Sequence, residues 1–309
     1  MGAYVIGIDG GGTAAKGMTA DTAGQVLRRF RGGTTNYNGA AREDVDHNVR
    51  ELLRAARGSL PADGCAAVCI GSAGVNNAAA AEALRSAVRD TGFTCPLRIV
   101  ADSVTAQAGA LDGGPGIVLI AGTGSICFAR RADGAQLQVG GNGHLIDDGG
   151  SGYDIARQML EAIVRAHDGR APATLLRDPV FEALHISDVN ELVSWLYDER
   201  RTKKEIASLA VLLKPAWARH DSAARHIVRR AAESLAELAR PAVSFMGCRT
   251  PLALSGSVLK HNAPIRSALT ELLRSGGTFG NAVEIVPPKH EADYGAVLLA
   301  RQLAAAPVP

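Results

Sequence analysis

The sequence predicts an α/β protein built from two domains, and three observations support this prediction. Short apolar segments typical of strands alternate along the chain with amphipathic segments typical of helices. The chain has 309 residues, more than the roughly 100–200 residues of one compact domain. Each half opens with a strand, a glycine-rich loop and a second strand, at residues 4–24 and again at residues 117–134. We place the domain boundary in the glycine-rich segment 112–116, so the first domain covers residues 1–115.

The first half is expected to begin with a hairpin. The apolar strand at residues 4–8 runs into the loop 9–13, and residues 14–20 then lack a helical pattern. A turn at residues 21–24 precedes a returning strand at 25–31. The other elements expected here are helices at 40–57, 77–90 and 104–111 and strands at 66–71 and 97–101.

The second half is expected to be richer in helix. Ser151 is a suitable cap for a helix running to about residue 166, with Asp154 at the capping-box position. Residues 171–246 are mostly helical in pattern, and Pro215 and Pro241 should break or bend that segment. The remaining elements expected are strands at 117–121, 252–255 and 283–286 and helices at 262–275 and 293–304.

Composition narrows the function classes. The net charge of +2 and the aromatic content of 4% argue against a nucleic-acid-binding surface. The sequence has no apolar run near the ~20 residues that cross a membrane, and we expect no leader peptide. The five cysteines are odd in number and irregularly spaced, which is typical of free thiols in a reduced compartment. We therefore expect a cytoplasmic protein.

The first glycine loop has the residues of a phosphate and metal site. Glycines let backbone amides approach phosphate oxygens closely, and an acidic residue at a strand end can hold a hydrated Mg²⁺. A threonine in the loop can bind a phosphate, and a lysine lies nearby. The alternative is a hairpin that needs glycine only for its bend. The candidate residues are Asp9, Gly10, Gly11, Gly12, Thr13 and Lys16, with Asp9 as the magnesium residue acting through water.

Two later loops repeat the arrangement of an apolar strand followed by glycine and hydroxyl residues. The loop after the strand 117–121 is a candidate second phosphate clamp, although such a loop can also be purely structural. The loop after the strand 252–255 is a candidate adenosine contact or, alternatively, a capped helix start. The candidate residues are Gly122, Thr123, Gly124, Ser125, Ser255, Gly256 and Ser257.

The sequence argues against two other nucleotide-binding motifs. The sequence contains no Walker-type phosphate loop. Gly10, Gly12 and Ala15 match a relaxed dinucleotide fingerprint, but that fingerprint must open a helix. Residues 13–24 have the pattern of a strand and a turn instead.

Asp102 is the candidate catalytic group. It follows the strand 97–101 directly, where a carboxylate can accept a proton from a substrate hydroxyl as a phosphoryl group arrives. The alternative is an N-cap for the helix that follows. Asp147 and Asp148 lie beside another helix start and can bind substrate hydroxyls or favour the helix dipole. His144 and the other histidines show no metal-ligand spacing.

Taken in order, the three loops resemble the phosphate-1, phosphate-2 and adenosine motifs of the hexokinase–actin superfamily. The whole chain resembles the N-acetylglucosamine kinase and bacterial glucosamine kinase group of the BadF/BadG/BcrA/BcrD ATPase family. This resemblance implies two ribonuclease-H-like (actin-like ATPase) domains around a central cleft, with ATP and Mg²⁺ as cofactors. It also implies a C-terminal domain over 116–290 with helical insertions and a helix over 291–309 that packs back on the first domain. By the same match, Thr13 and Thr123 contact ATP phosphates.

The resemblance extends to a sugar site and implies transfer of the γ-phosphate of ATP to the 6-hydroxyl of an amino sugar. It matches Thr35 and Asn36 to sugar contacts and Asp102 to the catalytic aspartate. The segment 140–151 resembles a family segment in which tryptophan stands at position 142 and glutamate at 149; here these are Asn142 and Gly149. Because of these two differences, the sequence does not decide whether the substrate is N-acetylglucosamine or glucosamine. By this match the sugar-site residues are Thr35, Asn36, Asp102, Gly141, Asn142, Gly143 and Asp148.

Two other functions fit the same resemblance. One is an ATPase that activates an acyl-CoA dehydratase through an iron–sulfur cluster, although the five cysteines form no evident cluster loop. The other is a non-catalytic sugar-binding regulator, although no DNA-reading segment is evident. The expected partner is a small amino sugar, with no nucleic acid and no membrane, and the relatives suggest a possible homodimer.

Overall fold

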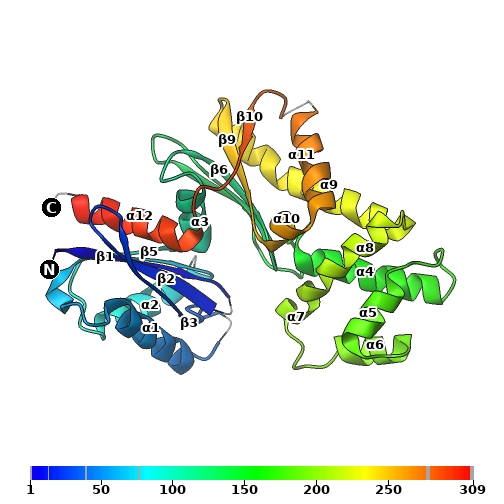
Figure 1. The fold of residues 1–309 in the computed structure, drawn as a ribbon, viewed down its shortest axis with the longest axis horizontal. Coiled ribbons are helices and arrows are strands. Elements are labelled where there is room, and N and C mark those ends of the chain that lie inside the picture. The colour runs from blue at the N-terminus through cyan, green and yellow to red at the C-terminus, as the bar shows by residue number, and fades with distance from the viewer. Residues whose placement is uncertain (1, 13, 39, 76, 276–278, 307–309) are drawn as a thin grey trace. The chain divides into compact units, whose positions relative to one another are not determined.

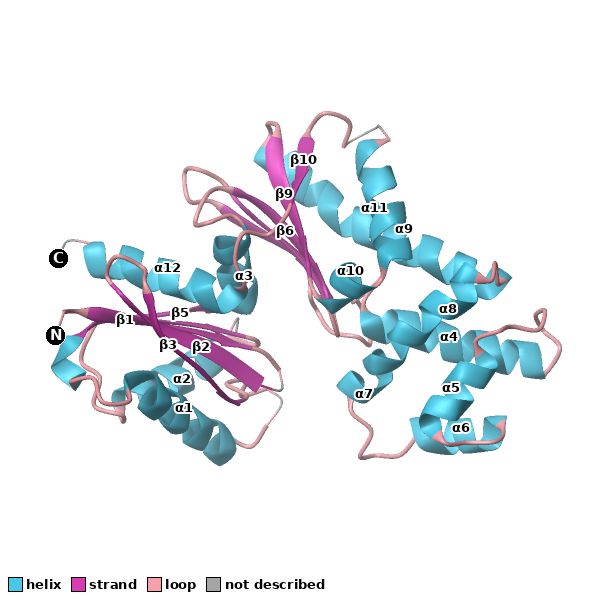
Figure 2. Ribbon diagram, in the orientation of Figure 1, coloured by secondary structure: helices cyan, strands magenta, loops and turns pink. Residues whose placement is uncertain are grey.

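The structure is a computed structural model that describes residues 2–12, 14–38, 40–75, 77–275 and 279–306. The chain divides into two compact units (Figures 1 and 2). Unit 1 combines Met1–Pro115 with Pro287–Pro309, and unit 2 is Gly116–Val286. Each unit contains a five-stranded sheet. The α/β prediction is therefore confirmed.

The sheet of unit 1 has the strand order β3-β2-β1-β4-β5. Its first three strands are antiparallel neighbours, whereas β4 and β5 run parallel to β1. The opening of the chain is thus a hairpin, as predicted, and the segment after the first loop is a strand, which rules out the dinucleotide fingerprint. The strands are β1 (Tyr4–Gly10), β2 (Ala14–Asp21), β3 (Val26–Gly33), β4 (Cys65–Ser72) and β5 (Leu97–Ala101).

Helices cover both faces of this sheet (Figure 1). Ile6 and Ile8 point to the face where α1 (Arg42–Arg57) buries its apolar side, and α2 (Ala78–Arg89) joins the same core. Side chains alternate along a strand, so Gly7 faces the opposite layer. There the final helix α12 (Ala292–Ala305) lies so close that a Cβ at Gly7 would be 2.3 Å from the amide nitrogen of Val297.

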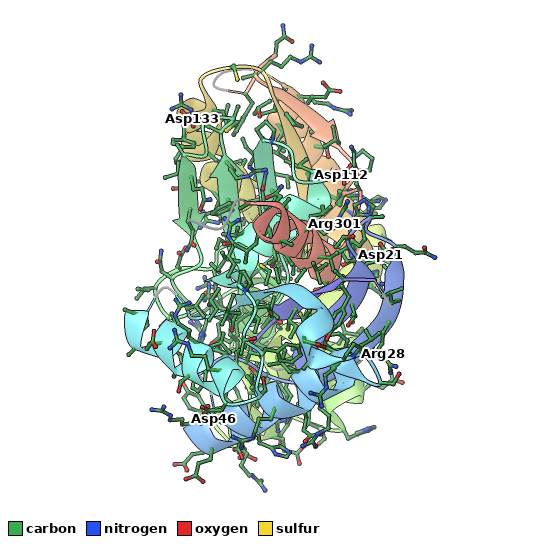
Figure 3. All side chains as sticks on the ribbon, turned by 90° about the vertical axis from the view of Figure 1, so that its left-hand side faces the viewer. Asp21, Arg28, Asp46, Asp112, Asp133 and Arg301 are labelled. Carbon is green, nitrogen blue, oxygen red and sulfur yellow. The ribbon has the colours of Figure 1, made fainter. Side chains whose placement is uncertain are left out.

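Close helix packing also joins α12 to α3 (Asp102–Ala110). A Cβ added at Gly295 would lie 2.0 Å from the carbonyl oxygen of Thr105, and one at Gly109 would lie 2.4 Å from the carbonyl oxygen of Glu291. At the other end of α12, Arg301 donates to the carbonyl of Thr22 at 3.0 Å, in the turn beside Asp21 (Figure 3). The last helix is therefore an integral layer of unit 1.

Unit 2 repeats the topology of unit 1, with the strand order β10-β9-β6-β7-β8. Again the first three strands in sequence are antiparallel neighbours and the last two run parallel to the first. The strands are β6 (Gly116–Ala121), β7 (Ser125–Arg130), β8 (Gln136–Gly140), β9 (Thr250–Ser255) and β10 (Val283–Val286). The similar openings of the two halves reflect this shared topology.

Between β8 and β9 lies a large helical layer, with α9 against the sheet. The helices of unit 2 are α4 (Gly152–His167), α5 (Arg177–Leu184), α6 (Val189–Leu196), α7 (Lys203–Ser208), η2 (Leu209–Leu212), α8 (Leu213–Ala218), α9 (Ser222–Met246), α10 (Ser257–His261) and α11 (Ala263–Arg274). The short η1 (Ala62–Gly64) belongs to unit 1. No helix in the described part of the chain is both long and apolar enough to cross a membrane.

Two details of these helices bear on the expectations from sequence. Pro241 lies inside α9, which continues to Met246, so this proline does not break the helix; its neighbours Ala239, Ala242 and Val243 are buried, and their packing outweighs one lost backbone hydrogen bond. Ser151 caps α4 as predicted.

The second half of the expected capping box at α4 is absent. The Asp154 carboxylate accepts from the amide of Gly150 at 2.9 Å instead of from the amide of Ser151. An aspartate is one methylene shorter than the usual glutamate, and here its carboxylate bonds the amide one residue further back.

Candidate functional site

The candidate residues of unit 1 meet at one edge of its sheet. β1, β4 and β5 are parallel neighbours, so their carboxyl ends lie side by side. Asp9 lies at the end of β1, Ser72 ends β4, and Asp102 follows β5 directly. Thr105 links two of these positions, because its hydroxyl lies 3.2 Å from Oδ1 of Asp9 and 2.8 Å from the carbonyl oxygen of Asp102. Strand order therefore assembles residues that are distant in sequence.

The Asp9 carboxyl lies in an environment that opposes its negative charge. Burial, followed by the nearby Asp102 and then Asp293, raises its pKa to about 7 against the hydrogen bond from Thr105 and the charge of Lys16. Lys16 is the direct cross-strand partner of Asp9 in the β1–β2 ladder, so the two side chains share one face of the sheet. A bound cation would relieve this charge and restore the carboxylate form.

Asp102 is half-buried and is the first residue of α3. Its Oδ1 accepts from the amide of Ser103 at 2.9 Å. Burial raises the pKa of Asp102, while amide hydrogen bonds from Ser103 and from its own backbone lower it. The N-cap position belongs to Ala101, so the simple capping alternative for Asp102 does not describe this helix start. A carboxyl group with a raised pKa is a better proton acceptor once ionised.

The loop after β3 is tied to both neighbouring strand ends. The Thr34 hydroxyl donates to the carbonyl of Gly11 at 3.0 Å, which fixes the loop to the first glycine turn. The Thr35 and Ser72 hydroxyls lie 2.7 Å apart, and Thr35 is only 1% exposed. A Cβ at Gly10 would lie 1.9 Å from the Thr35 hydroxyl oxygen, so glycine is required there. In this structure Thr35 therefore anchors the loop, and its predicted sugar contact stays a prediction.

Asn36 is better placed than Thr35 to meet a ligand. Its side-chain oxygen accepts from the amide of Asn38 at 2.9 Å, and its own amide donates to the Thr34 hydroxyl at 3.0 Å. Within the described residues, the side-chain NH₂ of Asn36 donates no hydrogen bond. The loop therefore fixes the side chain by its oxygen and leaves two donor hydrogens for a partner. Sequence patterns alone did not reveal the supporting roles of Thr34 and Ser72.

In unit 2 the second glycine loop is held by the start of α4. The amide of Gly152 donates to the carbonyl of Gly122 at 2.7 Å, and the amide of Tyr153 donates to that of Thr123 at 3.4 Å. The amide of Gly122 donates to the carbonyl of Gly124 at 2.9 Å. The amides of Thr123 and Gly124 have no partner among the described residues. They are thus the two loop amides that can bind an anion.

The third glycine loop packs directly on the second. Gly256 has a φ of +93°, and a Cβ there would lie 2.2 Å from the carbonyl oxygen of Ala121. Ser257 opens α10, and its hydroxyl oxygen would lie 3.9 Å from a Cβ at Gly122. Ser255 is the last residue of β9. Only glycine permits this approach, which brings the expected phosphate-2 and adenosine motifs together.

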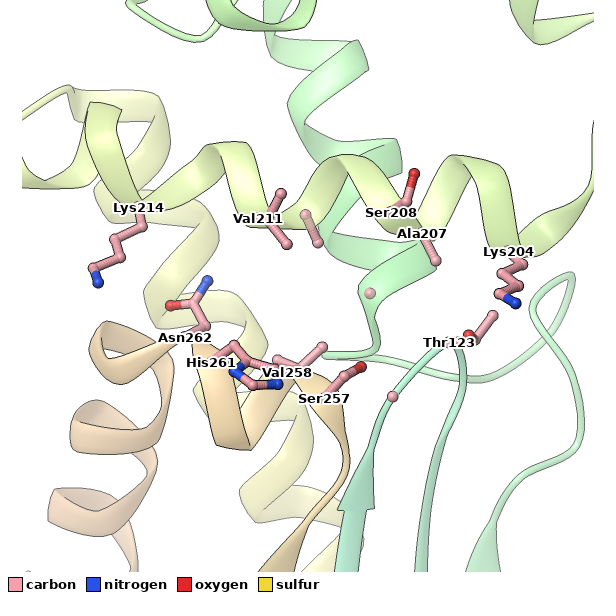
Figure 4. A pocket seen from close by; sticks show the side chains of 13 residues that line it. Thr123, Lys204, Ala207, Ser208, Val211, Lys214, Ser257, Val258, His261 and Asn262 are labelled. Carbon is pink, nitrogen blue, oxygen red and sulfur yellow. The ribbon is translucent and has the colours of Figure 1, made fainter. Parts of the chain in front are cut away.

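Both loops line a pocket of about 270 Å³ within unit 2 (Figure 4). Lys204 lies above Thr123 at one end of the pocket, and Lys214 lies near Asn262 at the other. Alanine and valine side chains form the wall between them. The lining residues are Gly122, Thr123, Gly152, Lys204, Ala207, Ser208, Ala210, Val211, Lys214, Ser257, Val258, His261 and Asn262. The sequence did not predict that residues from α7 to α8 line this pocket, because they belong to no recognisable motif.

The predicted sugar segment follows β8 in unit 2. Gly141 and Gly143 both have positive φ values, of +78° and +99°. Asn142 is exposed, and its backbone and side-chain nitrogens donate to Oδ2 of Asp147 at 3.1 and 2.9 Å. Asn142, at the position where the family pattern has tryptophan, is therefore part of a polar turn closed by Asp147.

Asp148 is buried and bound within its own unit. Its Oδ1 accepts from the amide of Ser125 at 3.0 Å, and its Oδ2 lies 2.6 Å from the ammonium of Lys203. It has a φ of +65°, which is unusual for a residue other than glycine. The predicted contact of Asp148 with a sugar hydroxyl therefore stays a prediction, while the contacts observed are to Ser125 and Lys203.

Thr13, predicted to contact phosphate, lies outside the described residues. Gly10, Gly11 and Gly12 form the end of β1 and the turn before β2, where the amide of Gly11 donates to the carbonyl of Ala14 at 3.0 Å. The described part of the chain has no group of three or more metal-ligating side chains. Magnesium commonly takes only one or two carboxylates and completes its shell with water and phosphate, so Asp9 and its neighbour Asp102 fit such an ion.

Two sheets of this strand order, each with polar glycine loops at its strand ends, define an actin-like ATPase fold. The chain belongs to the BadF/BadG/BcrA/BcrD ATPase family, whose model matches residues 6–300. The family resemblance inferred from the sequence motifs is thereby confirmed.

Three relatives give the comparison more detail. The chain is 31% identical over 303 residues to the N-acetylmuramic acid/N-acetylglucosamine kinase of Clostridium acetobutylicum, covering 96% of this chain and 98% of that one. It is 27% identical over 311 residues to the N-acetyl-D-glucosamine kinase of Dictyostelium discoideum, covering 96% and 97%. A solved structure of a candidate N-acetylglucosamine kinase from Chromobacterium violaceum matches with a TM-score of 0.80 and 29% identity, covering 97% and 99%.

Proposed function

We propose that this protein is an ATP-dependent kinase that phosphorylates the 6-hydroxyl of an N-acetylated amino sugar. The observation that carries the proposal is the position of Asp102, a half-buried carboxyl directly after β5 and beside Asp9. Sequence similarity to named amino-sugar kinases over nearly the full chain supports the same activity.

The nucleotide is proposed to bind in the unit 2 pocket. The free amides of Thr123 and Gly124 and the ammonium of Lys204 suit the triphosphate, because all three present positive charge or N–H donors. The apolar wall around Val211 and Val258 suits a flat purine ring. Ser255, Gly256 and Ser257 would then border the adenosine, and Gly122 and Ser125 would shape the phosphate loop.

In unit 1, Asp102 is proposed to accept the proton of the attacking hydroxyl. Asp9 would hold Mg²⁺ through water, and the ion when bound would neutralise phosphate charge. Gly10, Gly11, Gly12, Thr13 and Lys16 would line the same phosphate region. Because the transition state of phosphoryl transfer demands mainly positioning and charge neutralisation, these groups suffice for the chemistry.

The sugar is proposed to bind unit 1 through Asn36, with Thr35 holding the loop. Gly141, Asn142, Gly143 and Asp148 of unit 2 stay candidate sugar contacts, as the family resemblance implies. We infer N-acetylglucosamine as the substrate, with glucosamine and N-acetylmuramic acid as the nearest alternatives. The names of the relatives support the acetylated sugars. This segment departs from the family pattern at two positions, Asn142, which forms the polar turn with Asp147, and Gly149.

The deciding experiment measures Mg²⁺-dependent ADP release from ATP with N-acetylglucosamine, N-acetylmuramic acid, glucosamine, N-acetylmannosamine, glucose or no sugar. We expect release only with an amino sugar, with N-acetylglucosamine strongest, and phosphate on its 6-oxygen by NMR. Sugar-independent release would instead indicate an activator ATPase, and sugar binding without release would indicate a regulator.

A further inference from the structure

Asp148 forms an ion pair with Lys203, a residue to which the proposed function assigns no role. Lys203 Nζ lies 2.6 Å from Asp148 Oδ2, and the Asp148 side chain is only 4% exposed, compared with 30% for Lys203. A buried carboxylate without a counter-ion is strongly unfavourable. The lysine is therefore what allows a charged aspartate to remain in this position.

The aspartate in turn fixes the second glycine loop. Its Oδ1 accepts from the amide of Ser125, and the Ser125 hydroxyl donates to the carbonyl of Gly149 at 2.8 Å. The loop also lies directly against the carboxylate, since a Cβ at Gly124 would be 2.9 Å from Asp148 Oδ1. The direction of the Gly124 amide, one of the two free loop amides, therefore depends on where this carboxylate sits.

Lys203 is the first residue of α7, and the start of this helix is held by several contacts. Thr202 caps α7 in a reciprocal capping box with Glu205. The preceding Arg201 stacks its guanidinium 4.2 Å from the Trp195 ring centroid. The next residue, Lys204, lines the pocket, so the helix that presents Lys203 also forms the wall above the proposed triphosphate.

We infer that Lys203 is a positioning residue for the phosphoryl donor: by neutralising and fixing Asp148, it holds the loop 122–125 and helix α7 at the spacing that the triphosphate requires. This inference rests on the proposed function.

The test compares Lys203→Met, Lys203→Arg and Asp148→Asn/Lys203→Met with the native protein. We expect Lys203→Met to weaken binding of a non-hydrolysable ATP analogue, measured by calorimetry, by about tenfold or more. We expect the KM for ATP to rise similarly, while the Kd for N-acetylglucosamine changes by less than about twofold. Lys203→Arg should recover most of the analogue affinity, because it restores the positive charge. Arg170→Met, which removes a similarly short but exposed ion pair with Asp168, is the control and should leave analogue binding unchanged.

The double variant keeps the test decisive if Lys203→Met folds poorly. Removing both charges leaves no uncompensated buried carboxylate, and the amide oxygen introduced at position 148 still accepts from Ser125. We therefore expect the double variant to be more stable than Lys203→Met and to bind the analogue more tightly. Native-like analogue binding by Lys203→Met would overturn the inference, as would an equal loss of sugar and analogue affinity. A native protein that binds no ATP analogue would instead refute the proposed function itself.

Discussion

Asp9 near the end of β1 and Asp102 directly after β5 are two half-buried carboxyls on either side of β4, and their surroundings differ. Asp102 accepts from the amide of Ser103, whereas Asp9 accepts from the Thr105 hydroxyl and faces Lys16 across the ladder. Of the two, Asp102 follows its strand directly and is the first residue of α3. These different surroundings are the basis for proposing Asp102 as the proton acceptor and Asp9 as the cation-binding carboxylate.

Asp102→Asn is expected to lower kcat by about 10²–10⁴-fold, the usual contribution of general base catalysis. Binding of ATP analogue and sugar should change little, because asparagine keeps the shape and the bond to Ser103. Steady-state kinetics and calorimetry on the same protein check this. Near-native turnover would remove Asp102 as the base.

Asn36→Ala is expected to raise the KM for the sugar by about tenfold and the KM for ATP by much less. The physical reason is the loss of the two side-chain donors that the loop leaves unpaired. Asn38→Ala, which removes a neighbouring side chain that donates to the carbonyl of Gly74, is the control. Equal increases in both KM values would place Asn36 outside the sugar site.

Asp9 should make the Mg²⁺-free protein less stable as pH rises from about 4 to about 7. Its pKa is about 7 in the folded protein against an ordinary value of 3.8, so across this range the folded state holds a proton that the unfolded state has lost. Raising the pH therefore favours the unfolded state. Asp9→Asn should reduce this slope in urea unfolding experiments, whereas the exposed Asp63→Asn should not. An unchanged slope in Asp9→Asn would show that Asp9 ionises normally.

At the scale of elements, the turn between β9 and α10 depends on close backbone contact. Gly256 and Gly134 both have φ near +90°, but only Gly256 has a crowded Cβ position, whereas nothing lies within 4 Å of the Cβ position at Gly134. Periodicity predicted both β9 and its glycine turn. It did not show that this turn packs on the backbone of Ala121, because the contact joins segments far apart in sequence.

Gly134→Ala is therefore expected to lose about 1–2 kcal/mol of unfolding free energy from its left-handed φ alone. Gly256 combines its φ of +93° with a ψ of 158°, a region that is essentially restricted to glycine, and an added Cβ would also overlap Ala121, so the loss in Gly256→Ala should be clearly larger. Urea unfolding of both variants measures the difference. Equal losses in the two variants would mean that the turn at Gly256 can move away from Ala121 at little cost in free energy.

At the scale of the whole molecule, the proposed nucleotide pocket and the proposed catalytic carboxyl belong to different units. The pocket lies wholly in Gly116–Val286, whereas Asp9, Asn36 and Asp102 lie in the other unit. Each unit has its own apolar core. Each ligand should therefore be able to bind its own unit before the other arrives.

Hydrogen exchange is expected to show this division. An ATP analogue alone should protect residues 121–125 and 256–262, and sugar alone should protect residues 34–38 and the start of α3. The expectation follows from the pocket, whose lining comes from one unit only. Protection by the analogue confined to unit 1 would contradict the assignment of the pocket.

The sequence by itself determined the two-part α/β organisation, the glycine loops and Asp102, because these depend on local periodicity and on residues adjacent in the chain. The tertiary structure decided which residues surround them. Strand order placed Thr105 against Asp9, and the helical layer between β8 and β9 placed Lys203 on Asp148 and Lys204 over the second loop. These contacts join segments up to 96 residues apart, and no local pattern records them, because they arise from how sheets and helices pack.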